Sequence, residues 1–162
     1  MTAEPLPREE LIEQIHFFKT YRERLEQNLP AQEILQTIRE EILATTRLPL
    51  AIDYLYDEIK HHGQISKGMR QLSHYFTPFQ TCVMTAAEED KARFDLPIGL
   101  LILEREAEYL SQEPRAAGLF IYQFECISRN RIGYDPGLRA IADDPFYSQD
   151  WRDWHLMVKR NL

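Results

Sequence analysis

The sequence predicts an all-α protein: a bundle of six helices over residues 9–112 and an aromatic-rich C-terminal tail. Apolar residues recur every three or four positions through residues 9–112, which is the period of an amphipathic helix. Pro, Gly, Ser, Thr and Asp stand where such helices would begin and end. No convincing alternation of apolar and polar residues marks a strand in this span.

The first three helices follow from their apolar stripes and their ends. Residues 9–28 form the first, with Arg22 interrupting its stripe. The second starts at Pro30, because proline is tolerated in a first helical turn. The third runs from Pro49 and stops at Gly63, a residue typical of helix C-termini. The stripes are Leu11, Ile15, Phe18, Leu25 and Leu29; Ile34, Leu35, Ile38 and Ile42; and Ile52, Leu55 and Ile59.

Capping residues mark the next three helices. Ser66 is a suitable N-cap for a short helix that bears Met69, Leu72 and Phe76. Thr77 followed by Pro78 predicts the start of a fifth helix, and Asp95 can cap a sixth. The stripes of these two helices are Phe79, Cys82, Val83 and Ala86, and then Leu96, Leu100, Leu103, Ala107 and Leu110. Short connections between six such helices predict a compact bundle.

Residues 113–162 are expected to form an extension packed on the bundle. The stretch from Leu119 to Ile127 fits either a helix or a strand, and a helix is favoured because a single strand would have no partner here. Gly133, Asp135-Pro136-Gly137 and Asp144-Pro145 predict turns within residues 130–150. A closing helix is expected at residues 151–159.

Composition limits the classes of partner and location. A net charge of −7 argues against a nucleic-acid or anionic-membrane surface. The N-terminus MTAEPLPREE lacks the features of a signal peptide, and no apolar stretch reaches the roughly 20 residues that span a bilayer, so a cytoplasmic location is expected. Cys82 and Cys126 both have apolar neighbours; free buried thiols are the favoured interpretation and a disulfide is the alternative.

Two Glu-x-x-His patterns, Glu13 to His16 and Glu58 to His61, raise the possibility of a di-iron or di-manganese site in the bundle core. At about 100° per residue, however, all four residues lie off the apolar stripes of their helices. Ligands of a core metal must face the core, so we predict solvated helix faces. The sequence also has no phosphate-binding loop or nucleophile elbow, and it predicts no catalytic residue, metal ligand or cofactor site.

The charged stretch AAEEDKARFDL at residues 86–96 is predicted to connect two helices. Glu88 would point away from the apolar face, Glu89 would lie at its edge and pair with Arg93 or with backbone groups, and Asp95 would cap the next helix. The alternatives are a catalytic acid pair and a cation such as calcium at a subunit contact. We take Glu88, Glu89 and Asp95, together with Trp151 and Trp154, as candidate interaction residues.

Three segments, in this order and spacing, resemble a known domain: FFKTYRERLEQNLPAQEIL at 17–35, IDYLYDEIKHHGQISKGMRQLSHYF at 52–76 and TPFQTCVMTAAEEDKARFDLPIGLLILEREAEYL at 77–110. They are similar to the type II secretion system F domain, the cytoplasmic helical domain of the inner-membrane platform protein in type II secretion and type IV pilus assembly. This chain departs from the family at Asn28, where the family has glycine, and at Phe76-Thr77-Pro78, where the family has Phe-Pro-Pro. It also has one copy of the domain and no spanning segment.

The resemblance implies a non-enzymatic adaptor or scaffold that self-associates, as a homodimer, and contacts an assembly ATPase or other platform components. The tail aromatics Phe146, Tyr147, Trp151 and Trp154 would either cover the bundle or form a partner surface. Two other functions stay open: a di-iron metalloprotein that uses Glu13, His16, Glu58 and His61, and a bundle that binds a small regulatory ligand. A deep apolar pocket would favour the latter.

Overall fold

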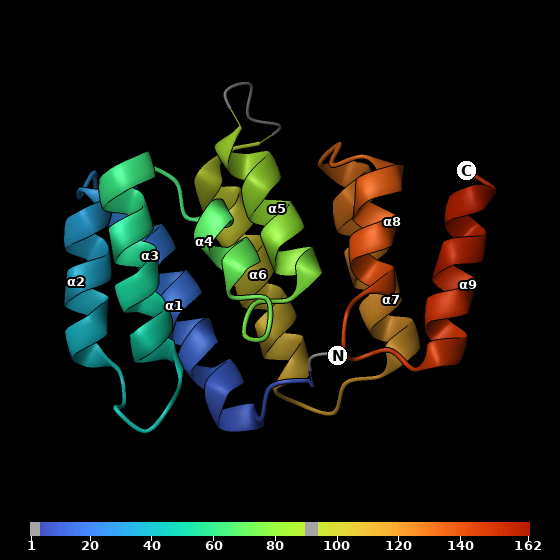
Figure 1. The fold of residues 1–162 in the computed structure, drawn as a ribbon, viewed down its shortest axis with the longest axis horizontal. Helices are drawn as coiled ribbons and strands as arrows, with labels where there is room; N and C mark the ends of the chain where they lie inside the picture. The colour runs from blue at the N-terminus through green and yellow to red at the C-terminus, as the bar shows by residue number, and fades with distance from the viewer. Residues whose placement is uncertain (1–3, 90–93) are drawn as a thin grey trace.

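The computed structural model describes residues 4–89 and 94–162. In these residues the chain is all-α, with nine helices and no strand (Figure 1), which confirms the predicted fold class. The helices are α1 (Arg8–Glu26), α2 (Ala31–Glu41), α3 (Leu48–His62), α4 (Ser66–Gln71), α5 (Pro78–Glu88), α6 (Leu96–Leu110), α7 (Ala116–Arg129), α8 (Tyr134–Ala142) and α9 (Gln149–Arg160).

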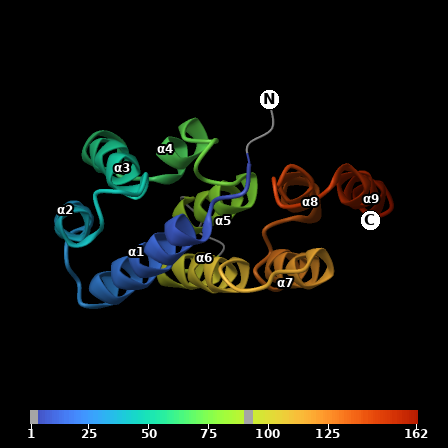
Figure 2. The ribbon, with the colours of Figure 1, turned by 90° about the horizontal axis from the view of Figure 1, so that it is seen from below.

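The helices lie side by side in an elongated array of two rows. Seen from below, α1, α6 and α7 form one row, α3, α4, α5, α8 and α9 form the other, and α2 lies at the end of the array beside α1 and α3 (Figure 2). The most extensive helix contact is between α1 and α6, while α8 packs between α5 and α9. The bundle and the C-terminal helices are therefore joined through α5 with α8 and through α6 with α7.

One apolar core runs between the rows, and its largest side chains are fully shielded from solvent. Their periodic spacing is what predicted the helices, because each helix must bury one stripe. The core includes Phe17, Phe18 and Tyr21 of α1; Ile34, Leu35 and Ile38 of α2; Leu48, Ile52 and Leu55 of α3; Phe79 and Val83 of α5; Leu100 and Leu103 of α6; Leu119 and Ile127 of α7; and Leu138 and Ile141 of α8.

Most of the predicted helix ends are present. Gly63 ends α3 with a left-handed φ of 72°, a conformation that glycine adopts without steric penalty. Thr77 and Gln80 form a capping box at α5: the Gln80 N–H donates to Thr77 Oγ1 (3.2 Å), and the Thr77 N–H donates to Gln80 Oε1 (2.9 Å). Asp95 occupies the N-cap position of α6, although its side chain makes no capping hydrogen bond.

Acidic side chains fix two of the connections by accepting backbone hydrogen bonds. Glu10 accepts from the N–H of Arg47 (2.9 and 3.0 Å) and so holds the connection between α2 and α3. Glu88 accepts from the N–H groups of Ile65 (2.9 Å) and Ser66 (2.8 Å) at the start of α4. The prediction that Ser66 is the N-cap is therefore wrong: Ile65 holds that position, and the carboxylate of Glu88 binds the exposed amides.

Helix α8 was not predicted, because its sequence is rich in turn residues. Gly133 precedes it with φ 103°, and Pro136 lies in its first turn, where the missing N–H has no intrahelical acceptor. Gly137 is required by packing, since a Cβ there would lie 2.7 Å from Ile127 Cδ1. The expected helix at residues 119–127 is present as α7, and the closing helix is present as α9.

Two further expectations concern the cysteines and membrane-spanning helices. Cys82 and Cys126 are free, and burial raises the pKa of each thiol to about 11. Of the helices in the described ranges, not one combines the length and the hydropathy needed to cross a bilayer.

Candidate functional site

A pocket of about 200 Å³ opens where the N-terminus of α1, the α4–α5 connection, α6 and the α8–α9 connection meet. Most of its wall is apolar, because proline, leucine and phenylalanine side chains from four separate segments line it. They include Leu6, Leu11, Phe76, Leu110, Pro145 and Phe146. A concave apolar site with a few polar groups is the usual form of a small-molecule site.

A chain of amide side chains crosses one wall of this pocket. Gln14 of α1 is fully buried, and its Oε1 accepts a hydrogen bond from Gln80 Nε2 (2.9 Å). Gln80 is itself oriented by the Thr77 capping box at the start of α5. The pocket wall thus joins α1 and α5 through two residues that are 66 positions apart in sequence.

Two polar atoms of this wall have no hydrogen-bond partner. They are Gln14 Nε2 and the hydroxyl of Tyr75, which is 4% exposed. Burial raises the pKa of Tyr75, and a hydrogen-bonding contact from the Gln14 side chain opposes that rise. Gln14 and Tyr75 therefore lie against each other in the wall. The large majority of buried polar groups in proteins are paired, and this mutual contact is the nearest approach to pairing that the two groups have.

Two buried acids form the opposite part of the wall. Glu106 of α6 and Asp144 after α8 both accept from Gln123 Nε2, at 2.8 and 3.1 Å. Asp144 also accepts from the Phe146 N–H (3.0 Å), and the Tyr147 hydroxyl donates to Gln123 Oε1 (2.7 Å). This network joins α6, α7 and the α8–α9 connection.

The acids have no basic partner. Among the described residues, no Lys or Arg forms an ion pair with Glu106 or Asp144. Burial, reinforced by the neighbouring Asp144 charge, raises the pKa of Glu106 to about 8, while the Gln123 amide opposes the rise. Burial also raises the pKa of Asp144. Burial therefore favours the uncharged form of Glu106.

The described lining has no pair of groups suited to covalent catalysis. Within the part of the chain that the structure describes, no Ser, Thr or Cys of the pocket bonds to a histidine or a carboxylate. The two thiols have raised pKa values, which disfavours a nucleophilic thiolate.

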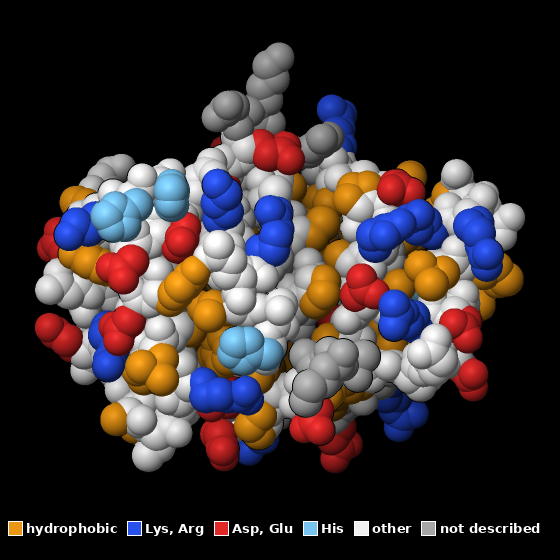
Figure 3. Space-filling model, viewed as in Figure 1, with side chains coloured by type: hydrophobic (Ala, Val, Ile, Leu, Met, Phe, Trp, Pro, Cys, Tyr) orange, Lys and Arg blue, Asp and Glu red, His pale blue; other side chains and the backbone are white. Residues whose placement is uncertain are grey.

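The residues predicted from the charged stretch lie outside this pocket. Glu88 caps α4, as described above, and Asp95 begins α6. Glu89 is exposed at the end of α5, beside a shallow groove lined by Cys82 and other residues of α5 and α8. Apolar side chains show in this seam, and charges of both signs are interspersed over the same face (Figure 3). The predicted partner Arg93 lies outside the described residues.

The aromatic tail residues are divided between core and surface. Tyr147 is buried and Trp151 is half-buried, while Trp154 is 40% exposed. Between them lies His155, which is fully buried and has no hydrogen-bond partner on either ring nitrogen. It stacks on Phe120 at 4.9 Å, and burial lowers its pKa to about 4.

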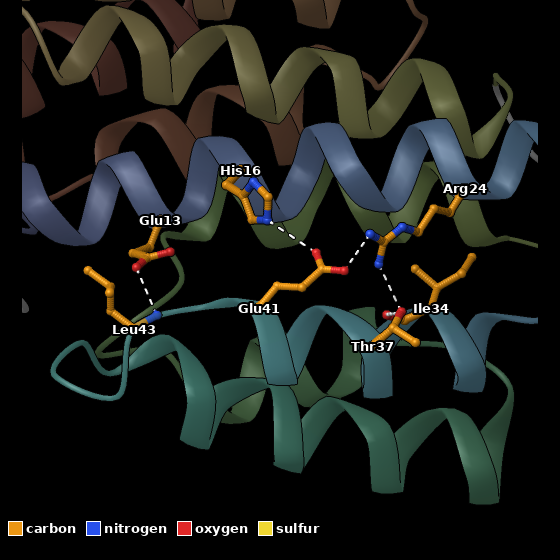
Figure 4. A network of polar contacts seen from close by, with 7 residues as sticks. All are labelled: Glu13, His16, Arg24, Ile34, Thr37, Glu41 and Leu43. Atoms are coloured by element: carbon orange, nitrogen blue, oxygen red, sulfur yellow. Dashed lines mark hydrogen bonds and ion pairs between the residues drawn. The ribbon is translucent and has the colours of Figure 1, made fainter.

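Two of the four residues of the metal hypothesis bind elsewhere (Figure 4). Glu13 Oε1 accepts from the Leu43 N–H (3.1 Å), and His16 Nε2 lies 3.6 Å from Glu41 Oε2. Glu41 is also bonded to Arg24, so these contacts tie α1 to α2. The prediction of a solvated face is wrong for Glu13, which is buried because its carboxylate holds the chain after α2.

Glu58 and His61, the other two, lie on α3. Glu58 is half-buried against Gly68 of α4, and His61 is exposed in the last turn of α3. Over the described ranges, no group of three or more His, Cys, Asp or Glu side chains is placed to hold a metal ion.

Comparison with known proteins assigns the chain to no family. No family model, no curated protein and no solved structure matches it. The resemblance to the type II secretion F domain therefore stays a prediction, and the function has to be argued from the site itself.

Proposed function

We propose that this chain is a non-enzymatic helical protein that binds a small, mostly apolar molecule in the pocket between α1, α5, α6 and the α8–α9 connection. The observation that carries the proposal is the pocket itself, a concave site of about 200 Å³ with a mostly apolar lining that also includes the buried acids Glu106 and Asp144. Small-molecule sites usually take this form, a concave apolar surface with a few polar groups.

The size of the pocket fits a molecule of this kind. A dry cavity of roughly 150 Å³ is enough to bind benzene, and this pocket offers about 200 Å³. Its apolar wall supplies hydrophobic binding energy, at about 25 cal/mol for each Å² of apolar surface buried. A ligand with one aromatic or branched aliphatic body and one polar end matches this lining.

Native mass spectrometry of the protein purified from its own cells tests the proposal. We expect a bound small molecule in a fraction of the chains, and we expect that fraction to fall when Leu11 is replaced by Arg to fill the pocket. Amide NMR titration with small aromatic compounds is the second measurement. If purified protein carries no molecule and none of these compounds shifts the signals around Gln14 and Tyr75, the proposal is wrong.

The second candidate is the interaction module that the F-domain resemblance implies. A row of aromatic rings on α7, α8 and α9 supports it, and we call this row, formed by Phe120, Phe124, Tyr134 and Trp154, the aromatic ridge. Phe120 contacts Trp154 (4.9 Å) and Phe124 stacks on Tyr134 (5.8 Å), while Tyr134 is 47% exposed. Exposed aromatic residues are enriched at protein interfaces.

For this candidate we take a second copy of the chain as the occupant of the aromatic ridge, since the family self-associates. Platform components or an assembly ATPase are the further partners implied by the resemblance. Sedimentation velocity over a concentration series tests self-association, with Trp154→Ala as the variant and the exposed Leu50→Ala as the control. A chain that stays monomeric at every concentration would rule out this candidate and leave the pocket proposal intact.

A further inference from the structure

The two buried acids of the pocket lie close enough together to act on one ligand. Glu106 of α6 is 1% exposed, Asp144 is 4% exposed, and both line the pocket. One nitrogen atom, Gln123 Nε2, donates to both carboxylates, at 2.8 Å and 3.1 Å. The two acids therefore lie within reach of a single donor group.

One carboxylate oxygen of this pair has no partner in the protein. Glu106 Oε2 accepts from Gln123, but no described residue donates a hydrogen bond to Glu106 Oε1. Buried polar atoms are normally paired, and a buried carboxylate is costly unless its oxygens are bonded. Since Glu106 lines the pocket, Oε1 is the oxygen available to a molecule bound there. Asp144 differs, because its two oxygens already accept from the Phe146 N–H and from Gln123.

The described lining holds no permanent positive charge that could balance these acids. It includes no Lys or Arg, its histidine, His74, is exposed, and the exposed Glu4 adds a further acid. Burial and the neighbouring Asp144 charge raise the pKa of Glu106 to about 8, as expected for a carboxyl whose charged form lacks a cationic partner. A bound cation would supply that partner.

An organic cation fits the rest of the lining better than a metal ion does. Calcium and magnesium ions are held by several oxygen ligands, whereas over the described ranges no group of three or more His, Cys, Asp or Glu side chains is placed to hold a metal ion. The other walls are apolar and include Leu11, Phe76, Leu110 and Phe146. Such walls suit a hydrocarbon body, and the face of an aromatic ring also attracts an ammonium group.

We infer, on the basis of the proposed binding function, that the pocket binds an organic monocation, a protonated amine with an apolar body, whose N–H groups donate to Glu106 Oε1 and to Asp144. An ammonium group has three N–H donors, so one nitrogen can bond to both acids, as Gln123 Nε2 does from the other side. The desolvation of the acids is already part of the folded state, so binding adds only the desolvation of the amine.

Four matched probes test the ligand class on the full chain at neutral pH by NMR titration: benzylammonium, benzyl alcohol, toluene and benzoate. They share one aromatic ring and differ in the charge and the donors of its substituent. We expect benzylammonium to bind most tightly, roughly tenfold more tightly than benzyl alcohol, because charge-assisted hydrogen bonds are about twice as strong as neutral ones. Equal or tighter binding of any other probe overturns the amine inference and leaves the proposed function standing. Failure of all four to bind overturns both.

The Glu106→Gln variant tests whether the buried acid selects the cation. Glutamine has nearly the same shape and can still accept from Gln123, so the pocket is expected to keep its form. We expect the preference for benzylammonium over benzyl alcohol to fall roughly tenfold, while the affinity for toluene changes little. Glu108→Gln is the matched control, because it removes the same charge from the same helix at a residue that pairs with Arg105 outside the pocket.

Two results from these variants contradict the inference. An unchanged preference in Glu106→Gln would mean that the acid does not contact the cation. An equal fall in Glu108→Gln would mean that the net charge of the protein, rather than the acids of the pocket, attracts the amine. Asp144→Asn is a second variant that removes the other acid and can still accept from the Phe146 N–H; it should lower the preference as well, and an unchanged preference there counts against the inference in the same way.

Discussion

Replacing Glu106 with Gln should stabilise the protein at alkaline pH and change it little at acid pH. The pKa of Glu106 is raised from 4.5 to about 8 by burial and by Asp144. Between these two values the folded chain binds more protons than the unfolded chain, so the stability of the native protein falls as the pH rises. Glutamine is the uncharged isostere of the protonated acid, and it can keep the hydrogen bond from Gln123.

The size of the effect follows from the same two pKa values. Each pH unit inside the window lowers the stability by up to about 1.4 kcal/mol. From about pH 5.5 to about pH 8 the native protein should therefore lose roughly 3 kcal/mol that Glu106→Gln does not lose. The contributions of titrating groups away from Glu106 cancel, since they are the same in both proteins, whereas Asp144 responds to the loss of the Glu106 charge.

Urea unfolding at these two pH values, with linear extrapolation to water, measures the difference. Glu108→Gln is the matched control, because Glu108 lies on the same helix and pairs with Arg105 near the surface. The reasoning is refuted if Glu106→Gln follows the native protein at both pH values, which would place the pKa of Glu106 near its ordinary value. Destabilisation of the variant at the lower pH would show that the carboxyl is needed in its charged form.

Three further predictions concern packing and helix ends. The native protein should lose roughly 2 kcal/mol of folding stability between about pH 7 and about pH 5, and His155→Phe should remove this loss. The pKa of His155 is lowered to about 4, so the unfolded chain takes up its proton first and native stability falls with pH; thermal unfolding at the two pH values checks this, and an unchanged acid sensitivity contradicts it. Gly137→Ala should destabilise the fold by about 1–3 kcal/mol, because its Cβ would lie 2.7 Å from Ile127. Urea unfolding measures this, and a free energy of unfolding equal to that of the native protein would disprove the close approach. Glu88→Ala should cost about 1–2 kcal/mol and speed hydrogen exchange of the two amides it binds at the start of α4, and unchanged exchange there would count against the cap.

The fold class could be predicted because each helix buries one apolar stripe, and that stripe is a local property of the sequence. The position of α8 could not be predicted, because Pro136 and Gly137 are turn signals. Proline also occurs in the first turn of a helix, and glycine also permits a close contact such as the one with Ile127. Ser66 was misassigned for a related reason. Its amide is bound by Glu88, 22 positions away, and a cap from another helix leaves no local pattern.

The candidate site was missed because its members are far apart in sequence. Gln14 and Gln80 are 66 positions apart, and Gln123 and Asp144 are 21 apart. A local signal was nevertheless present. Gln14 stands between Leu11 and Phe18 on the apolar stripe of its helix, and Glu106 stands on the stripe of α6 between Leu103 and Leu110. A polar residue at a core position is a better indicator of a site than an exposed cluster of charges.

NMR titration of the protein with small aromatic compounds, followed at the backbone amides of the residues that line the pocket, tests the central claim most directly. The account predicts that the signals of Leu11, Phe76 and Phe146 shift and saturate, while the signal of the exposed Leu50 outside the pocket stays in place. Saturating amounts of these compounds with no change at the lining residues would contradict the account, because the pocket would then bind nothing of the class that its lining favours.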